Sequence, residues 1–294
     1  MLTNFLFRRR TFPFGFSGTR ECREYEGSII QSIFCQSNLN MKMRNIYSLE
    51  SQGLRMPEQG TQEWLDGRKG RITGSKPSSL WFSFKQESDW DEILEGWFGD
   101  KKEEFDETSI KRMAWGSKHE DTAAAVIVDN IPNSHLFECP QININDVYAV
   151  SPDGALIVLE DDQQTPKWWC NIEIKCPGRF SSDGKEQSPE AMKEYLKKKW
   201  KRPASYYMTQ IHQEMVGQQV NETLFVVWTP LMTRMWKIKF DQEYWDLCLE
   251  VFENFRLKNI PFDVMYSKID SLKGRSFGVA NVPIWKEVYH ESSI

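Results

Sequence analysis

Asp153, Glu173 and Lys175 have the residue types and the spacing that suit metal-assisted cleavage of a phosphodiester. Two carboxylates held close together repel each other, and a hard divalent cation that prefers oxygen ligands relieves this repulsion. Such an ion polarises a phosphate and lowers the pKa of a bound water, while a neighbouring lysine orients the nucleophile. The alternative is a surface hairpin with an ordinary lysine–glutamate pair, because triplets of this kind are common in charged chains.

The stretch CNIEIKCPG, residues 170–178, predicts a strand whose two faces differ in character. Successive side chains of a strand point to opposite faces, so Asn171, Glu173 and Lys175 share one face and the isoleucines share the other. Burying a glutamate and a lysine there is unfavourable unless they are paired or bind a charged ligand. The strand is therefore either the seat of an ion pair or part of a site.

The residues before this strand predict a β-hairpin that brings Asp153 beside Glu173. Two apolar runs flank the polar stretch 160–166, which is typical of a hairpin turn. With the centre of the turn at residue 163, antiparallel pairing sets 153 opposite 173, with about 5 Å between their Cβ atoms. We expect Lys175 to lie beside this pair.

A third acid, Glu120, lies in the predicted helix MAWGSKHEDTAAAVIVDN, which ends near Asn130. At helical spacing Glu120 shares a face with Ala123, Ala124 and Ile127, and the small alanines allow a close approach to a sheet. This face would direct Glu120 towards the sheet. The alternative is a first-turn glutamate that the helix dipole stabilises.

The hydrophobic periodicity over the rest of the chain predicts a mixed α/β or α+β domain with a central mixed sheet flanked by helices. The expected strands cover residues 135–139, 141–150, 154–160, 168–176, 223–230 and 234–241. The expected helices include 188–202, 205–219 and a closing amphipathic helix over 242–258.

Composition limits the classes of protein to which the chain can belong. Its net charge of −5 excludes a bulk cation that coats nucleic acid, so any DNA binding requires a local basic surface. Its six cysteines form no CxxC pair and no zinc-site spacing, which indicates reduced intracellular thiols. No stretch approaches the roughly 20 apolar residues of a membrane helix, so we expect no membrane partner.

Residues 1–55 lack clear periodicity, and we interpret them as an N-terminal extension, largely disordered, before a single domain over 56–294. The first twenty residues contain four arginines and no acid, which fits either an organelle-targeting presequence or a plain disordered extension. The reduced cysteines and the N-terminal composition predict an intracellular location. For a eukaryotic host the sequence does not distinguish nucleus from mitochondrion.

Five motifs occur in an order that resembles the YqaJ-type viral recombinases, a family that includes phage lambda exonuclease-like enzymes within the PD-(D/E)XK nuclease superfamily. The motifs are GTQEWLDGRKGRITGS, WGSKHEDTAA, SPDG, IEIKCP and YYMTQIHQEM. Each motif alone is weak, but five in this order are specific, and the resemblance spans roughly residues 60–240. It implies a restriction-endonuclease-like PD-(D/E)XK core.

The resemblance also implies a role for each matching residue. Asp153, Glu173 and Glu120 would be the acids that bind the metal, with the Ile174 carbonyl as a further ligand. Lys175 would be the catalytic lysine and Gln210 the glutamine of the helix after the core strands, and Arg68 and Ser75 would hold a 5′ phosphate. An arginine fork and a hydroxyl suit a phosphate physically. The alternative for Arg68 is a solvated charge near a turn.

The implied activity is Mg²⁺-dependent 5′→3′ exonuclease digestion of duplex DNA ends, with Mn²⁺ as a substitute ion, in DNA recombination or repair. The implied partners are double-stranded DNA with free ends and, as further candidates, a single-strand annealing protein and other copies of the chain. A related branch carries an iron–sulfur cluster held by four cysteines, but only Cys248 lies beyond Cys176, so we expect none here. The alternatives are a structure-specific endonuclease on the same core and a non-catalytic DNA-end-binding module.

A basic stretch, GKEQSPEAMKEYLKKKWKRP over 184–203, concentrates its positive charge between Lys197 and Arg202. This charge either neutralises DNA phosphates or stabilises the C-terminal end of a helix. Tyr206 and Tyr207 follow, and we expect one of them to pack in the core and the other to stack on a base or line the groove.

Overall fold

The protein is described here from a computed structural model that covers residues 61–99, 105–163, 165–178, 188, 190–191, 194, 198–275, 279–280 and 288–289. The extension predicted over 1–55 lies outside these residues. The helix predicted over 188–202 falls only partly within them, and its described residues are mostly helical.

The described chain contains both helices and strands. The helices are α3 (Gln62–Arg68), the 3₁₀ helix η1 (Lys76–Ser78), α4 (Ser79–Phe82), α5 (Asp89–Phe98), α6 (Glu107–Asn130), α8 (Tyr206–Gln218), α9 (Gln242–Leu257) and α10 (Phe262–Gly274). The strands are β1 (Ile72–Thr73), β2 (Ser134–Phe137), β3 (Ile142–Asn143), β4 (Tyr148–Val150), β5 (Gly154–Leu159), β6 (Pro166–Lys175), β7 (Glu222–Thr229), β8 (Met232–Lys239), β9 (Val279–Ala280) and β10 (Val288–Tyr289). None of these described helices has both the length and the apolar character needed to cross a lipid bilayer.

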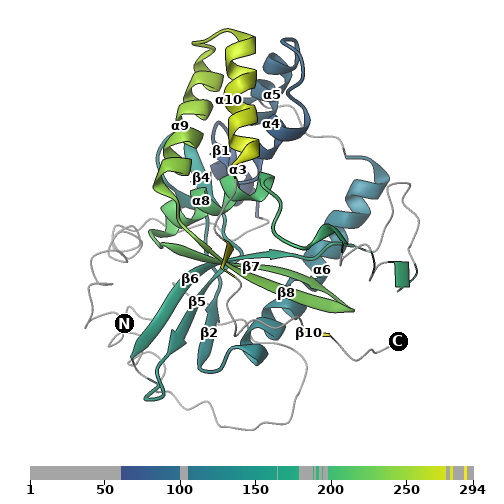
Figure 1. The fold of residues 1–294 in the computed structure, drawn as a ribbon, viewed down its shortest axis with the longest axis vertical. Helices are drawn as coiled ribbons and strands as arrows, with labels where there is room; N and C mark the ends of the chain where they lie inside the picture. Colours follow the sequence, from purple (N-terminus) through teal and green to yellow (C-terminus); the bar gives the residue numbers. More distant parts are fainter. Residues whose placement is uncertain are drawn as a thin grey trace.

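A mixed sheet forms the centre of the fold (Figure 1), which confirms the fold class predicted from the sequence. Its strand order is β10-β8-β7-β6-β5-β2, and β9 also pairs with β8. β6 runs parallel to β7, whereas β5 pairs antiparallel with both β6 and β2. The strand β6 therefore lies inside the sheet, with a partner on each side.

Two apolar clusters cover the two faces of this sheet. On one face, Ala123 and Ala124 of α6 pack with Ile172 of β6. On the other face, Ile211 and Met215 of α8 belong to a larger cluster that extends into α9 and α10. The small alanines let α6 lie close to the sheet, as expected from the sequence. Helices on both faces leave the segment 170–174 of β6 buried.

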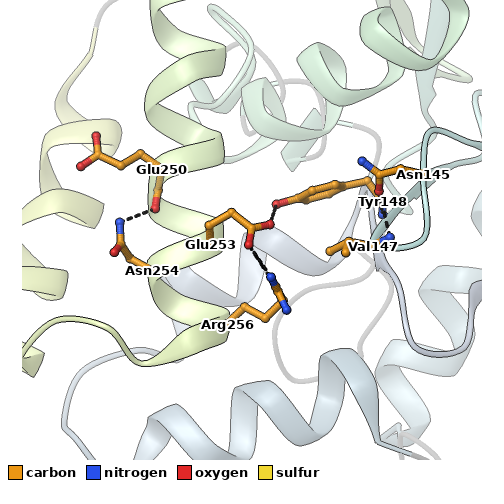
Figure 2. Close-up of polar contacts among 7 residues, drawn as sticks. All are labelled: Asn145, Val147, Tyr148, Glu250, Glu253, Asn254 and Arg256. Carbon is orange, nitrogen blue, oxygen red and sulfur yellow. Dashed lines mark hydrogen bonds and ion pairs between the residues drawn. The ribbon is translucent and has the colours of Figure 1, made fainter.

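A second, smaller sheet has the order β1-β4-β3, and it corrects the prediction of one strand over 141–150. The side chain of Asn145 accepts hydrogen bonds from the backbone N–H groups of Val147 and Tyr148, and this turn separates β3 from β4. Figure 2 shows how β4 is joined to α9: the Tyr148 hydroxyl donates to Glu253 at 2.8 Å, and Arg256 binds the same carboxylate. The turn breaks the predicted strand into two short ones.

Helices α4, α5, α9 and α10 gather on the side of α8 that faces away from the large sheet (Figure 1). The apolar face of the predicted amphipathic helix, α9, is buried, and its Phe252 and Phe255 contact Trp97 of α5. The prediction that α9 closes the fold is wrong, because α10 follows it and pairs with it. Helix α8 thus lies between this helical group and the sheet.

Candidate active site

The hairpin of β5 and β6 has the register predicted from the sequence. Five consecutive pairs, from Gly154↔Ile172 to Val158↔Trp168, are centred on residue 163, and the register shifts only beyond Val158. Asp153 directly precedes the first of these pairs and so lies beside Glu173. A Cβ atom added at Gly154 would lie 2.8 Å from the carbonyl oxygen of Phe137, so this position requires glycine. Close packing of the backbone therefore fixes the chain directly after Asp153.

Asp153 is bound to the strand that carries the second acid. Its Oδ2 accepts a hydrogen bond of 2.7 Å from the backbone N–H of Ile174. Because the N–H and C=O of one strand residue point to the same side of the strand, the Ile174 carbonyl also faces Asp153. The structure thus brings together the side chain and the backbone carbonyl that the resemblance assigns as ligands.

Glu173 is almost fully buried, with 1% of its surface exposed, and it is surrounded by polar groups. Its Oε1 pairs with the ammonium of Lys175 and accepts a hydrogen bond of 2.8 Å from the amide of Gln210. Its Oε2 has no hydrogen-bond partner within the described residues. Three residues singled out from the sequence therefore meet at one carboxylate, and one buried oxygen of that carboxylate remains without a donor.

Helix α8 carries a fourth acid, Glu214, that the sequence did not reveal as part of this site. Its two carboxylate oxygens accept hydrogen bonds from the amides of Gln210 at 2.9 Å and Asn171 at 3.0 Å. The spacing of Gln210 and Glu214, four residues apart on one helix face, was the available signal. Glu214 is 1% exposed and belongs to the same buried polar cluster as Glu173.

Two further glutamines of α8 hold the surrounding backbone in place. The Gln213 amide donates to the carbonyls of Ile72 in β1 and Ala149 in β4. The Gln218 amide donates to the carbonyl of Gly154, next to Asp153. Helix α8 therefore connects the small sheet, the start of β5 and Glu173 of β6.

Burial and mutual repulsion raise the pKa values of these acids. Burial, followed by the charges of Glu173 and Glu120, raises the pKa of Asp153 well above its usual range. Burial and then the charge of Glu214 raise the pKa of Glu173 to about 8. Burial and then the charge of Asp153 raise the pKa of Glu214 to about 7. The cluster is thus a place where negative charge is unfavourable without a cation.

Lys175 is the positive charge of this cluster. Burial alone would lower the pKa of its ammonium, but the carboxylates of Glu173 and Asp153 raise that pKa above its ordinary value. Its Nζ also lies 5.3 Å from the centre of the Tyr207 ring. The neighbouring carboxylates thus favour the charged ammonium of Lys175, which pairs with Glu173.

Glu120 lies well inside α6, which begins at Glu107, so the alternative of a first-turn glutamate is wrong. The helix reaches the site from the apolar face of the sheet. The charge of Glu120 raises the pKa of Asp153, and burial followed by the charge of Glu120 raises the pKa of Cys176 to about 12. The carboxylate of Glu120 is therefore close to the end of β6 and to Asp153.

Arg68 is anchored beside the chain segment that leads to Asp153. Its guanidinium donates to the hydroxyls of Ser151 at 3.4 Å and Thr73 at 3.1 Å, and it lies 4.3 Å from the ring centre of Trp64. The Trp64 indole also donates to Ser151 at 2.9 Å. Ser151 precedes Asp153 by two residues, so Arg68 is held next to the acid cluster.

Ser75 is exposed, and the residue before it, Gly74, lies against α8. A Cβ atom added at Gly74 would lie 3.1 Å from the Gln210 side chain and 3.6 Å from a Glu214 oxygen. The absence of a side chain at Gly74 thus lets this turn approach the acid cluster. Of the other nearby cations, Lys69 pairs with Asp66 and Lys76 donates to backbone carbonyls.

The chemistry of these groups fits a hard divalent cation. The atoms that could ligate it are carboxylate oxygens and one carbonyl oxygen, which such ions prefer. Oε2 of Glu173 is buried and accepts no hydrogen bond from the described residues. No group of three or more His, Cys, Asp or Glu side chains in the described part of the chain has the arrangement of a finished metal site. Lys175, Gln210 and the Ile174 N–H bind carboxylate oxygens of Glu173 and Asp153 in this structure.

A family model of the YqaJ-like viral recombinase domain matches residues 63–217, more than half of the 294 residues. The chain belongs to this family. The match includes Arg68, Glu120, Asp153, Glu173 and Gln210, so the YqaJ-like domain contains the whole cluster described above. No curated protein sequence matches the chain significantly.

Two solved structures of one enzyme are similar to this YqaJ-like protein. The alkaline exonuclease LHK-Exo from Laribacter hongkongensis is 20% identical, with a TM-score of 0.44 over 72% of this chain and 96% of that chain. Its complex with dAMP is 18% identical over the same shares of the two chains, with a TM-score of 0.46. Scores below 0.5 are weak, so the family assignment rests on the sequence match.

Proposed function

We propose that this protein is a metal-dependent deoxyribonuclease that digests duplex DNA from its 5′ ends. Membership of the YqaJ-like family supports a nuclease, and an exonuclease agrees with the similar enzyme LHK-Exo. The observation that carries the choice of DNA ends is the position of Arg68. Its guanidinium binds Ser151, two residues before Asp153, so a terminal phosphate bound there would lie beside the acids.

In this proposal Asp153, Glu173, Glu120 and the Ile174 carbonyl would hold Mg²⁺, or Mn²⁺ in its place. The bound ion would supply Lewis-acid polarisation of the phosphate and a more acidic water. The carboxylates of Glu173 and Asp153 raise the pKa of the Lys175 ammonium, which would donate a hydrogen bond to the attacking water or to a phosphate oxygen.

The neighbouring residues orient the substrate and the acids. Gln210 fixes the carboxylate of Glu173 through a hydrogen bond of 2.8 Å. Arg68 and the exposed Ser75 hydroxyl would bind the 5′ phosphate, because an arginine fork and a hydroxyl match its oxygens. The side chains of Lys201 and Arg202 are exposed just before α8 and would neutralise phosphates of the duplex.

The wider assignments are part of the same proposal. DNA recombination or repair is the process that fits digestion from 5′ ends, with a single-strand annealing protein as the candidate partner. A single exonuclease domain over 56–294, with an extension over 1–55, remains a prediction, as do homo-oligomers and location in the nucleus or mitochondrion.

The test is digestion of end-labelled linear duplex DNA with Mg²⁺ or with EDTA, beside the variant Lys175→Ala. We expect degradation of the linear duplex with Mg²⁺ only, survival of a covalently closed circle, and loss of activity in the variant. Cleavage of the circle would show that the protein is an endonuclease and not an exonuclease. If wild type and variant are equally inactive but still bind DNA, the protein is a DNA-binding module without catalytic activity.

A second arm tests the recognition of ends. We expect the wild type to prefer a 5′-phosphate over a 5′-hydroxyl, because Arg68 would bind the phosphate with charge-assisted hydrogen bonds. Arg68→Ala should remove most of this preference while the overall fold remains. A wild type that treats both ends alike would contradict the role of Arg68.

A further inference from the structure

Phe82, the last residue of α4, is the most exposed large hydrophobic side chain in the described part of the chain. More than half of its surface, 55%, is accessible to solvent. Leu80, two residues earlier in α4, is fully buried and anchors this short helix in the core. Phe82 is therefore not needed to hold α4 in place, although single exposed apolar residues are by themselves ordinary.

The position of Phe82 distinguishes it from the other exposed apolar residues, because it begins a row of aromatic rings that leads to Lys175. Its ring meets the edge of Tyr206 with 4.9 Å between centroids. The rings of Tyr206 and Tyr207 lie 4.2 Å apart, and Tyr207 lies 5.3 Å from the Lys175 ammonium. The exposed end of the row is thus connected to the proposed site by direct contacts.

The inner end of this row is firmly supported. Tyr207 stacks on the buried Trp200, with 5.9 Å between centroids and 20° between planes, and also contacts Phe225 of β7. Tyr206 is half-buried, whereas Phe82 projects furthest into solvent. The row is therefore rigid at its base and accessible at its tip, as a stacking surface for a flat ligand requires.

We propose that Phe82, supported by Tyr206, stacks on an unpaired base of the DNA next to the proposed cleavage site. This inference rests on the proposed function, because it takes DNA as the ligand. Aromatic rings bind any nucleobase through its face, so the contact tolerates every sequence, as a non-specific nuclease needs. Phe82 also follows Ser75 through η1 and α4, about 12 Å along the helices, so it lies near the proposed 5′-phosphate pocket.

The charge around the row agrees with a nucleic acid as the ligand. Lys201 and Arg202 are exposed and lie a few residues before Tyr206 in the chain. A cationic backbone-binding region next to an aromatic surface is the combination that proteins use for single-stranded nucleic acids. An apolar surface of another protein would need no such cations.

The test measures binding separately from cleavage by using Lys175→Ala as the parent protein. A short duplex with 2-aminopurine at its 5′ end reports base stacking by fluorescence, and anisotropy gives Kd. We expect Phe82→Ala in this parent to weaken binding about tenfold and to remove the fluorescence change. Phe82→Trp should keep both, because tryptophan presents a larger ring face.

Two further variants identify the cause of any loss. Phe82→Leu keeps an apolar side chain without a ring, so it should behave like Phe82→Ala if stacking is the interaction. Phe105→Ala removes a phenylalanine of similar exposure, 46%, just before α6, and should bind DNA normally. Thermal unfolding of each variant would confirm that the fold is retained.

Failure of this inference can be told apart from failure of the proposed function. If the wild type degrades linear DNA but Phe82→Ala binds as tightly as its parent, only the stacking role is overturned. Full rescue by Phe82→Leu, or an equal loss in Phe105→Ala, would also overturn it. Suppose that the wild type does not degrade DNA with Mg²⁺, while Phe82→Ala loses DNA binding and Phe82→Trp keeps it. The stacking role of Phe82 is then supported and the proposed nuclease activity is overturned.

Discussion

The two faces of strand β6 bury side chains of opposite character within the same few residues. Ile172 and Ile174 point to α6, where Ala123 and Ile127 complete an apolar cluster. Glu173, between them in sequence, points to α8 and meets the side chains of Gln210 and Glu214. Both faces are almost fully closed to solvent, so exposure does not distinguish them.

The difference separates the residues that stabilise the fold from those that could perform chemistry. Burial of apolar surface at Ile172 contributes to folding. Burial of Glu173 works against folding when the carboxylate is charged, as its pKa of about 8 indicates. The contacts with Lys175 and Gln210 offset part of this cost, but Oε2 of Glu173 has no donor among the described residues. The polar face is therefore best explained by a ligand that it binds.

Substitution of the consecutive residues Ile172 and Glu173, which point to opposite faces of β6, tests whether one face serves stability and the other activity. Glu173→Gln should reduce kcat about a thousandfold, because it removes a charge that would hold the metal, while stability is unchanged or higher. Ile172→Ala should lower the free energy of unfolding by about 2–5 kcal/mol through loss of packing. Its activity per folded molecule should remain near that of the wild type.

Denaturant unfolding and single-turnover digestion measure the two quantities separately. The comparison fails if Glu173→Gln keeps substantial activity, because the carboxylate would then be only a structural group. It also fails if Ile172→Ala loses activity out of proportion to its folded fraction. In either case the two faces of β6 would not have separate roles.

Helix α8 offers the second contrast, because its opposite side buries a polar group with no part in the site. His212 packs against Tyr244 and Phe240, accepts a hydrogen bond from the Asp241 N–H, and contacts the Met208 carbonyl. The Asp241 N–H needs a lone pair, which makes the imidazole neutral with its proton on Nδ1. Burial lowers the pKa of His212 to about 4.

This depressed pKa predicts an acid sensitivity that belongs to His212. The unfolded chain, with a pKa near 6.5, binds the proton more readily than the folded protein, so stability is present above that pH and is lost as pH falls. Between about pH 7.5 and pH 5 the loss should be about 2 kcal/mol. Urea unfolding of wild type and His212→Gln should show a flatter pH dependence in the variant. The same change of unfolding free energy with pH in both proteins would contradict a buried neutral imidazole at His212.

The parts of the fold that the sequence predicted are those with strong periodicity. The register of β5 and β6 followed from two apolar runs around a polar turn, and Asp153 directly precedes the first pair of this register. The small sheet was missed because strands of two or three residues show too little alternation. The turn at Asn145 interrupts what looks like one continuous strand.

The candidate site was predictable where one element carries the signal. Alternation along one strand identified Glu173 and Lys175, and helical spacing directed Glu120 towards the sheet. The spacing of Gln210 and Glu214 on one helix was a local signal for this acid, but its contact with Asn171, 43 residues away, follows from no local pattern. Only the packing of α8 on β6 brings these two groups together.

The carboxylate of Glu214 accepts hydrogen bonds from Gln210 and Asn171 at once. As a positioning residue it should affect the chemical step through Gln210 and leave DNA binding alone. Glu214→Ala should lower kcat about tenfold with KM unchanged, because a misplaced amide no longer fixes Glu173. Glu214→Gln keeps one accepting oxygen and should lie closer to the wild type.

Steady-state digestion of linear duplex by these two variants decides whether the polar face acts as one unit. A rise in KM with kcat unchanged would mean that Glu214 shapes the DNA surface and does not support Glu173. An equal loss in Glu214→Ala and Glu214→Gln would mean that the charge itself matters, which would place Glu214 among the acids around the metal. We predict that kcat falls from wild type to Glu214→Gln to Glu214→Ala. This order is expected only if Glu214 acts by accepting the hydrogen bond from the Gln210 amide.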